Sequence, residues 1–175
     1  MLILSVYSIL FQNSTINANE NAFQEIILNF QNLSVRFTLP LKYTVKKKSG
    51  NTCFFLLPYQ QGTNLSSFNL EVLYNKANEE SYYNFFWNRI IEALAIEFNH
   101  QKFFQDFTSE GAMGKTYSVI AFLWKGKTDK IGFYFTYSVV NPGVYDQDDS
   151  LQEYDRDRLI LYINTIMNSV IIQEK

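Results

Sequence analysis

Apolar and polar residues alternate along two well-separated segments, and this period of two restricts the fold more than any other feature of the sequence. Val35, Phe37 and Leu39 occupy alternate positions, with polar residues between them. Every second residue of Phe68–Tyr74 is likewise apolar. Side chains of a strand point alternately to its two faces, so both segments are predicted to be strands with one buried face.

Further strands surround these two. We expect strands at Glu25–Phe30, Leu33–Leu39, Thr52–Leu57, Phe68–Tyr74, Phe103–Phe107, Thr116–Trp124 and Lys130–Val140. The polar pair Gln31–Asn32 and the glycine-containing segment Lys125–Asp129 are short enough to close hairpins. Pro40 and Pro58 each follow an apolar run and stop it, because proline cannot donate to a ladder. The sheet is therefore predicted to be largely antiparallel.

A period of 3.6 replaces the period of two in residues 81–99. One arc of this segment is apolar and collects Tyr83, Phe86, Trp87, Ile90, Ile91, Leu94 and Phe98. We expect a helix of about five turns, with Trp87 and Leu94 facing the sheet. Ser150 and Glu153 have the spacing of a capping box that begins a second helix. The predicted fold class is α+β: an antiparallel β-sheet with two main helices packed on it.

The size and charge of the chain limit its organisation and its partners. With 175 residues it has the size of one domain, which we assign to residues 25–175 after an N-terminal segment, residues 1–24. The net charge is −2 and the pI about 5.4, and Lys46–Lys48 is the one dense basic run. A nucleic-acid partner is therefore not expected, because phosphate binding needs a basic surface. The lysines are interpreted as a solvated hairpin tip beside Gly50.

The N-terminal segment leaves two alternatives open. Met1–Phe11 is apolar, and Ile16–Ala18 could precede signal-peptidase cleavage after Ala18, although no Lys or Arg comes before the apolar stretch. The same residues could instead form a first strand. The protein is periplasmic or secreted if residues 1–18 are a signal peptide and cytoplasmic otherwise. No membrane span is expected in the mature domain.

The residues that usually carry catalysis or bind metals are scarce. Cys53 and His100 are the only cysteine and histidine, so they cannot assemble a closed zinc site. Cys53 lies in an apolar run and is interpreted as a buried structural thiol. We expect no catalytic residue, no metal, no cofactor and no enzymatic activity.

Two loops resemble ligand-binding motifs without meeting their requirements. Gly111–Thr116 resembles a phosphate-binding loop, but a strand follows it where that motif needs a helix, so a hairpin turn is the better interpretation. Asp146, Asp148 and Ser150 match the first ligand positions of a calcium-binding loop. Leu151 stands where that loop requires glycine, and the acids are interpreted as solvated charges.

A stripe on the polar side of the first predicted helix is the candidate contact surface. On a helix over 81–99, Phe85 and Ile96 lie opposite the apolar arc, with Tyr82 and Arg89 nearby. Aromatic residues and arginine are enriched at protein interfaces. We expect Tyr82, Phe85, Arg89 and Ile96 to contact a protein partner or a second copy of the chain in a homodimer. The alternative is that Met1–Phe11 covers the stripe within the same chain.

The order of the predicted elements resembles that of a known family. Leu33–Pro40 is similar to the strand and proline that open PsbP-like domains, and the strand, helix and hairpin that follow continue the pattern over roughly residues 25–172. The same fold class includes a Ran-binding import factor and chaperones of type VI secretion effectors. The resemblance implies a PsbP-like sandwich and a non-catalytic, protein-binding domain: an accessory factor, chaperone or immunity-type protein. A small-ligand or lipid-binding domain with an aromatic pocket between sheet and helix is the alternative.

Overall fold

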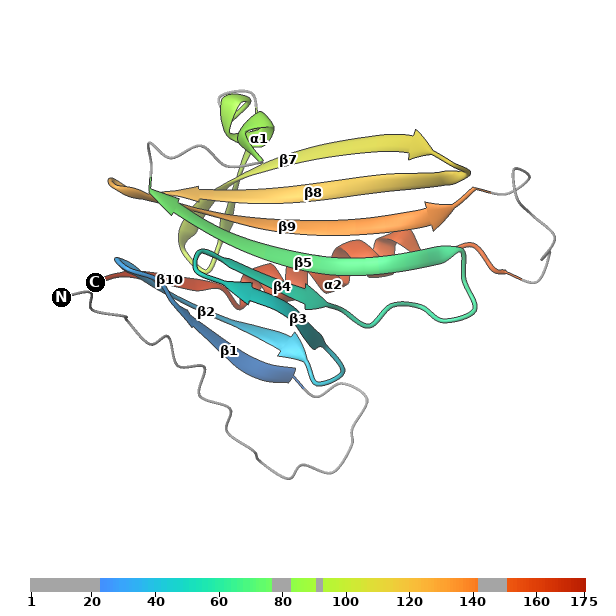
Figure 1. Ribbon diagram of the computed structural model, residues 1–175, viewed down its shortest axis with the longest axis horizontal. Coiled ribbons are helices and arrows are strands. Elements are labelled where there is room, and N and C mark those ends of the chain that lie inside the picture. Colours follow the sequence, from blue (N-terminus) through green and yellow to red (C-terminus); the bar gives the residue numbers. More distant parts are fainter. Residues whose placement is uncertain (1–22, 77–82, 91–92, 142–150) are drawn as a thin grey trace.

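A computed structural model describes residues 23–76, 83–90, 93–141 and 151–175 (Figure 1). Within these ranges the chain forms ten strands and two helices. Their order is β1 (Phe23–Asn29), β2 (Leu33–Pro40), β3 (Thr44–Ser49), β4 (Thr52–Leu56), β5 (Leu65–Lys76), α1 (Asn84–Asn88), β6 (Leu94–Phe98), β7 (Gln101–Ala112), β8 (Lys115–Lys125), β9 (Asp129–Val140), α2 (Arg156–Asn168) and β10 (Ile171–Glu174).

The strands form two antiparallel sheets of unequal size. The large sheet has seven strands in the order β3-β4-β5-β9-β8-β7-β6, and the small sheet has three in the order β1-β2-β10. The long hairpin of β8 and β9 lies near the centre of the large sheet and sets Phe122 opposite Phe133. In the small sheet β2 is central, because it pairs with β1 over Ser34–Pro40 and with β10 from the far end of the chain.

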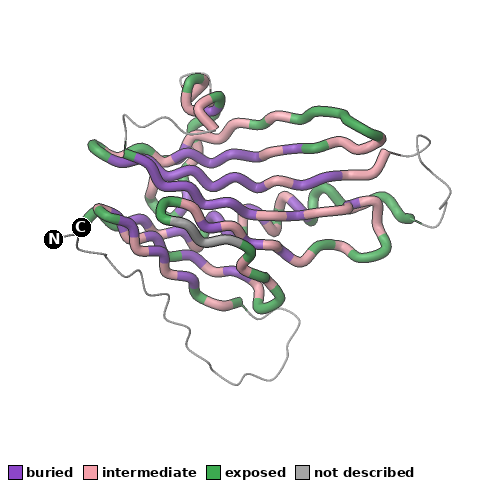
Figure 2. The backbone as a smooth tube through the Cα atoms, viewed as in Figure 1, coloured by how far each residue is buried: buried purple, intermediate pink, exposed green. Residues whose placement is uncertain are grey.

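One face of the large sheet, called the inner face here, is covered by the small sheet together with α2 (Figure 1). Alternation places Phe55 of β4 and Phe133 of β9 on this face, where the buried Phe37 of β2 meets both rings edge-on at 5.9 Å. Phe68 of β5 lies 5.6 Å from the ring of Tyr162 on α2. Figure 2 shows the resulting bands of buried residues along both sheets. The main core is therefore a layer of interlocking aromatic rings.

The β6–β7 hairpin is fastened to the small sheet at its turn. Asn99 and His100 form this turn with positive φ angles of 48° and 59°. The Gln101 side chain donates to the carbonyl oxygen of Ile172 at 2.7 Å and accepts from its N–H at 3.0 Å. Asn99 donates to the Val170 carbonyl oxygen at 3.2 Å. The Gln101 side chain thus bonds both backbone groups of Ile172 on β10, as a residue of a neighbouring strand would.

The predicted fold class is wrong. The described chain is predominantly β, and instead of two main helices on one sheet it has two antiparallel sheets and one helix of substantial length, the 13-residue α2. The second helix, α1, has five residues and lies on the other face of the large sheet, called the outer face. A small second sheet occupies much of the space that the prediction gave to helices.

The helix predicted over 81–99 accounts for most of this error. Asn84–Asn88 is helical, but Arg89 and Ile90 form a turn, and Leu94–Phe98 is strand β6. Leu94, Ile96 and Phe98 are apolar at every second position, and this spacing also fits the arc of a helix. Trp87 faces the sheet as predicted, whereas Leu94 is 66% exposed, so the prediction for Leu94 is wrong. Residues 81 and 82 lie outside the described residues.

The hairpin predictions are confirmed. Glu25–Phe30 pairs with Leu33–Leu39, and Thr116–Trp124 pairs with Lys130–Val140. Gly114 closes a turn between β7 and β8, where a phosphate-binding loop would need a helix. The second helix exists but begins at Arg156, where the Asp155 side chain caps it by accepting from the Arg158 N–H at 2.9 Å.

The capping serine, Ser150, lies outside the described residues, as do Asp146, Asp148 and Met1–Phe11. Neither helix that the structure describes has the length and hydropathy needed to cross a bilayer.

Candidate protein-binding surface

Helix α1 is held against the outer face of the large sheet by one buried ring. Phe86 is 3% exposed and belongs to a second apolar cluster with Leu73 of β5, Tyr134 of β9, and Ala121 and Leu123 of β8. These residues alternate with those of the main core along the same strands, so their side chains point to the opposite face. The sequence Phe85–Phe86 therefore places one ring in this cluster and the other outside it.

Polar groups fix α1 in addition to the apolar contact. The rings of Tyr83 and Tyr134 are stacked with centroids 3.7 Å apart. The Tyr83 hydroxyl donates to Glu71 at 2.9 Å, and the indole N–H of Trp87 donates to the Tyr134 hydroxyl at 3.0 Å. Glu71 is buried on β5, so the hydrogen bond satisfies a carboxylate that would otherwise be costly to bury. This short helix is thus anchored to the sheet by Tyr83 at its start and by Trp87 near its end.

The ring of Tyr134 covers Gly132, which lies two residues earlier on β9 and on the same outer face. A Cβ at position 132 would lie about 2.4 Å from ring carbons of Tyr134, so only glycine leaves room for the ring. Burial raises the pKa of Tyr134 well above its ordinary value, and the carboxylate of Glu71 adds to this effect, while the hydrogen bond from Trp87 opposes it. The hydroxyl therefore stays protonated well above neutral pH, and it accepts a hydrogen bond from Trp87.

Phe85, Arg89 and Asp106 form a group that we call the α1 patch, in which Phe85 is exposed and the other two residues are partly buried. Phe85 is 50% exposed, and the Arg89 guanidinium lies over its ring, 4.1 Å from the centroid. Arg89 donates from Nε to a carboxylate oxygen of Asp106 on β7 at 3.0 Å, and its Nη2 also contacts that oxygen. Arg89 is thus held in one position by a carboxylate on one side and a ring on the other.

The structure brings together two of the four predicted contact residues. Phe85 and Arg89 share the outer side of α1, as the helical spacing predicts. Ile96 lies on β6 and packs partly buried against the main core, so its placement on the same helical stripe is wrong. Tyr82 lies outside the described residues. Asp106 was missed by the sequence reasoning, although an acidic residue within the aromatic run Phe103–Phe107 was a signal that it needs a partner.

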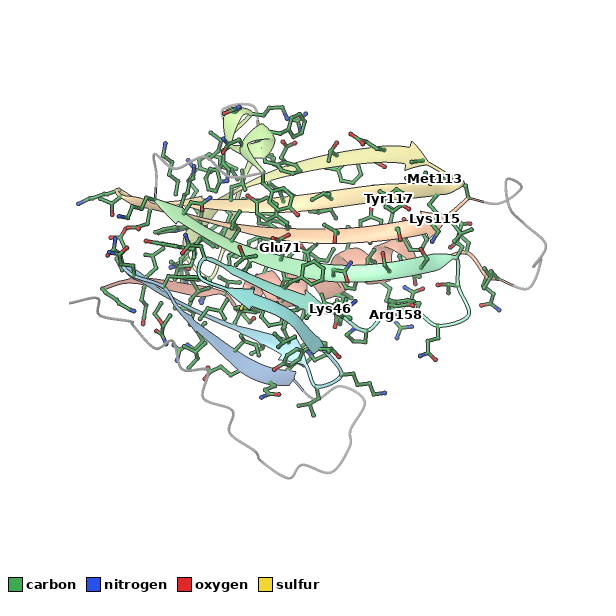
Figure 3. The ribbon with its side chains drawn as sticks, in the orientation of Figure 1. Lys46, Glu71, Met113, Lys115, Tyr117 and Arg158 are labelled. Atoms are coloured by element: carbon green, nitrogen blue, oxygen red, sulfur yellow. The ribbon has the colours of Figure 1, made fainter. Side chains whose placement is uncertain are left out.

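The other end of the outer face presents a different surface. Met113, Lys115 and Tyr117 gather there, at the β7–β8 turn and along β8, far from α1 (Figure 3). Met113 and Tyr117 are exposed. A shallow depression formed with Gly114 and Val140 opens to solvent at this turn.

Asp129 is the most deeply buried acid that the structure describes, and its hydrogen bonds give it a role in stabilising the fold. It accepts hydrogen bonds from the hydroxyls of Tyr74 and Thr128 and from the side chain of Asn32, 3.2 Å away. Burial alone would raise the pKa of this carboxyl, but the three donors and the charge of Lys76 outweigh burial and hold the pKa below its ordinary value. Its donors come from the β1–β2 turn, from β5 and from the residue before β9, so Asp129 joins the two sheets.

The other side chains considered for catalysis or metal binding, Cys53 and His100, lie on different elements. Cys53 is buried in β4, as predicted. His100 is exposed at the β6–β7 turn, with its Nδ1 3.6 Å from a carboxylate oxygen of Glu97. Over the ranges that the structure describes, no three His, Cys, Asp or Glu side chains are grouped closely enough to hold a metal ion.

Comparisons with known proteins do not assign the chain to a family. No family model matches the chain, and no curated protein matches it significantly. Among solved structures, a crystal structure from Bacteroides thetaiotaomicron VPI-5482 is similar with a TM-score of 0.48 and 10% sequence identity. The match covers 81% of this chain and 46% of the other, so the chain spans about half the length of that protein.

Proposed function

We propose that this protein is a protein-binding domain whose partner docks on the α1 patch. The observation that carries the proposal is the half-exposed ring of Phe85 stacked on Arg89, which Asp106 holds in place. Phe85 supplies apolar area, and the guanidinium edge offers donors to a partner's carboxylates or carbonyl oxygens. Aromatic residues and arginine are enriched in the contacts that dominate binding energy.

The rigidity of the patch favours binding. Ordering a long side chain costs conformational entropy when a complex forms. Arg89 has already lost much of that freedom through its contacts with Asp106 and Phe85, and Phe86 fixes the helix beneath. A partner would therefore meet a preorganised surface.

The protein-binding proposal is preferred to the ligand-binding alternative because of how the interior is filled. An aromatic ligand pocket between sheet and helix would need rings that line an empty space. Here Tyr162 of α2 packs on Phe68, and Phe68 packs on Phe135 with ring centroids 6.3 Å apart. The rings contact one another where the pocket would be.

The proposed role is that of an accessory factor, a chaperone or an immunity-type protein. These roles come from the resemblance of Leu33–Pro40, the strand Phe68–Tyr74 and the hairpin of β8 and β9 to PsbP-like domains. In each of them a rigid domain acts by holding another protein, and no catalytic group is required.

The test is affinity purification from the native source with the wild-type protein and two variants. Phe85→Asp introduces a charge at the centre of the patch. Tyr59→Asp is the matched control, because Tyr59 is 45% exposed and lies on the segment between β4 and β5. We expect both variants to fold, and only Phe85→Asp to lose a specific partner. If a folded Phe85→Asp protein retains every partner of the wild type, the patch is not the binding surface.

A further inference from the structure

The two edges of the large sheet differ in how they are protected. At one edge, β3 carries Lys46, Lys47 and Lys48 and has an irregular register between Val45 and Lys47. Lysines and bulges on edge strands oppose pairing with another chain. At the other edge, β6 has the sequence Leu-Ala-Ile-Glu-Phe, with one charged residue and a regular register. The β6 edge therefore lacks the protection that β3 has.

The turn of the β6–β7 hairpin determines which backbone groups of β6 are available. A two-residue turn with positive φ at both positions makes its flanking residues, Phe98 and Gln101, a hydrogen-bonded pair. Because such pairs alternate along an antiparallel ladder, Ile96 and Leu94 also bond to β7. The N–H and C=O groups of Ala95 and Glu97 then point away from β7. Among the described residues, no turn or loop hydrogen bond reaches these groups.

We propose that a second copy of this chain pairs with β6 through the same strand, antiparallel and centred on Ile96. In this register Ala95 of one copy lies opposite Glu97 of the other, and the reverse holds by symmetry. Ala95 and Glu97 are the residues whose backbone groups point outward, so each of the two Ala95–Glu97 pairs exchanges two hydrogen bonds. The arrangement is isologous, as in most protein dimers, and it extends the large sheet across both copies.

The side chains of β6 are self-complementary in this register. Leu94, Ile96 and Phe98 lie on the inner face, and each meets an apolar residue of the partner strand: Leu94 meets Phe98, and Ile96 meets Ile96. The pairing would cover Leu94, which is 66% exposed in the single chain. On the outer face Glu97 lies opposite the small Ala95, so the two carboxylates avoid direct opposition, which is destabilising for like charges.

The contact is expected to be weak. Five residues at about 3.4 Å each give a paired segment of about 17 Å, which belongs to the small interfaces typical of transient complexes. The dimer should therefore appear in the micromolar to millimolar range. The pairing does not depend on the proposed function, because Phe85 on α1 and Arg89, which caps the C-terminal end of α1, lie outside the strand.

The first test compares two leucines of equal exposure. Leu94 is 66% exposed on β6 and Leu161 is 68% exposed on α2. Sedimentation velocity over increasing concentration should show dimer formation for the wild type and for Leu161→Glu, and at least a tenfold weaker association for Leu94→Glu. Circular dichroism melts verify that both variants fold. A wild type that is monomeric throughout, or a Leu94→Glu variant that associates as the wild type does, overturns the proposal.

The second test needs no variant. Amide exchange followed by NMR should show Leu94 and Ile96 protected at every concentration, whereas Ala95 and Glu97 become protected only as the dimer forms. Protection of Ala95 and Glu97 in the monomer would mean that the chain's own residues occupy the edge, which contradicts the proposal. Phe85→Asp should leave this concentration dependence unchanged, so loss of a partner and loss of self-association are measured separately.

Discussion

Phe85 and Phe86 are adjacent phenylalanines in opposite environments, and replacing each by alanine measures how α1 is attached. Phe86 is 3% exposed. Truncation of a buried phenylalanine costs about 3–5 kcal/mol, and because a five-residue helix can settle into the space, we expect about 3 kcal/mol for Phe86→Ala.

Phe85→Ala should cost less. Phe85 is 50% exposed, so about half of the 1.5–3 kcal/mol for full burial, roughly 1 kcal/mol, is lost. The contact with Arg89 adds about 0.5 kcal/mol. The two rings also touch each other at 5.4 Å, but both variants lose that contact, and it cancels in the comparison. The expected difference between the variants is therefore about 1.5–2 kcal/mol.

Urea unfolding gives both free energies. Far-UV circular dichroism follows the sheets, and tryptophan fluorescence follows Trp87 on α1 and Trp124 on β8, the two tryptophans of the chain. The two signals should unfold together in the wild type, while Phe86→Ala should lower the midpoint clearly more than Phe85→Ala. Equal losses, or a larger loss for Phe85→Ala, would refute the assignment of Phe86 as the anchor and Phe85 as an exposed contact residue.

Four further changes test the structure away from α1. Asp129→Asn should destabilise the protein by about 1.5–3 kcal/mol at neutral pH in chemical denaturation. Because the folded pKa of Asp129 lies below its ordinary value of about 4, the wild type should lose this advantage as the pH falls below about 4 and through the folded pKa, and the variant should not. The hydroxyl of Tyr162 has no hydrogen-bond partner among the described residues, so Tyr162→Phe should be neutral or stabilising at pH 7. Burial raises the pKa of Tyr162, so the wild type should lose stability above about pH 10, where tyrosine ionises in the unfolded chain, and the variant should lose less. Thermal melts across pH check both expectations. Gly132→Ala should lower stability by about 1–3 kcal/mol, since the methyl group displaces the Tyr134 ring, and an unchanged melting temperature would contradict that packing. Asp155→Ala should cost about 1 kcal/mol by removing the cap of α2, with Asp155→Asn as the control that retains a capping oxygen.

The parts of the fold that the sequence predicts correctly are hairpins, in which two strands marked by apolar alternation follow one another in the sequence and also pair with each other. The β8–β9 hairpin combines alternation with a short turn, so its partner strand is adjacent in sequence. The third strand of the small sheet, β10, could not be predicted in this way, because it has four residues and pairs with β2, with Ile172 opposite Val35. Nothing local in either segment specifies the other.

The error at β6 has a different cause. Leu94, Ile96 and Phe98 satisfy both a strand and one arc of a helix, so periodicity alone could not decide. The Asn99–His100 turn is the deciding feature, because asparagine tolerates positive φ and closes two-residue hairpins. For the same reason the candidate surface was predicted only in part: Phe85 and Arg89 lie where the segment is helical, and Ile96 lies where it is not.

Site-specific photo-crosslinking from position 85 tests the central claim, that the α1 patch binds a partner protein, most directly. A benzophenone amino acid is placed at position 85 or, as the control, at position 59 of the full chain, which is then irradiated in its native cells. Mass spectrometry identifies the adducts. A discrete partner crosslinked from position 85, absent from position 59 and lost when Asp106→Ala releases Arg89, is the predicted result. The same adducts from both positions, or none from position 85, would contradict it.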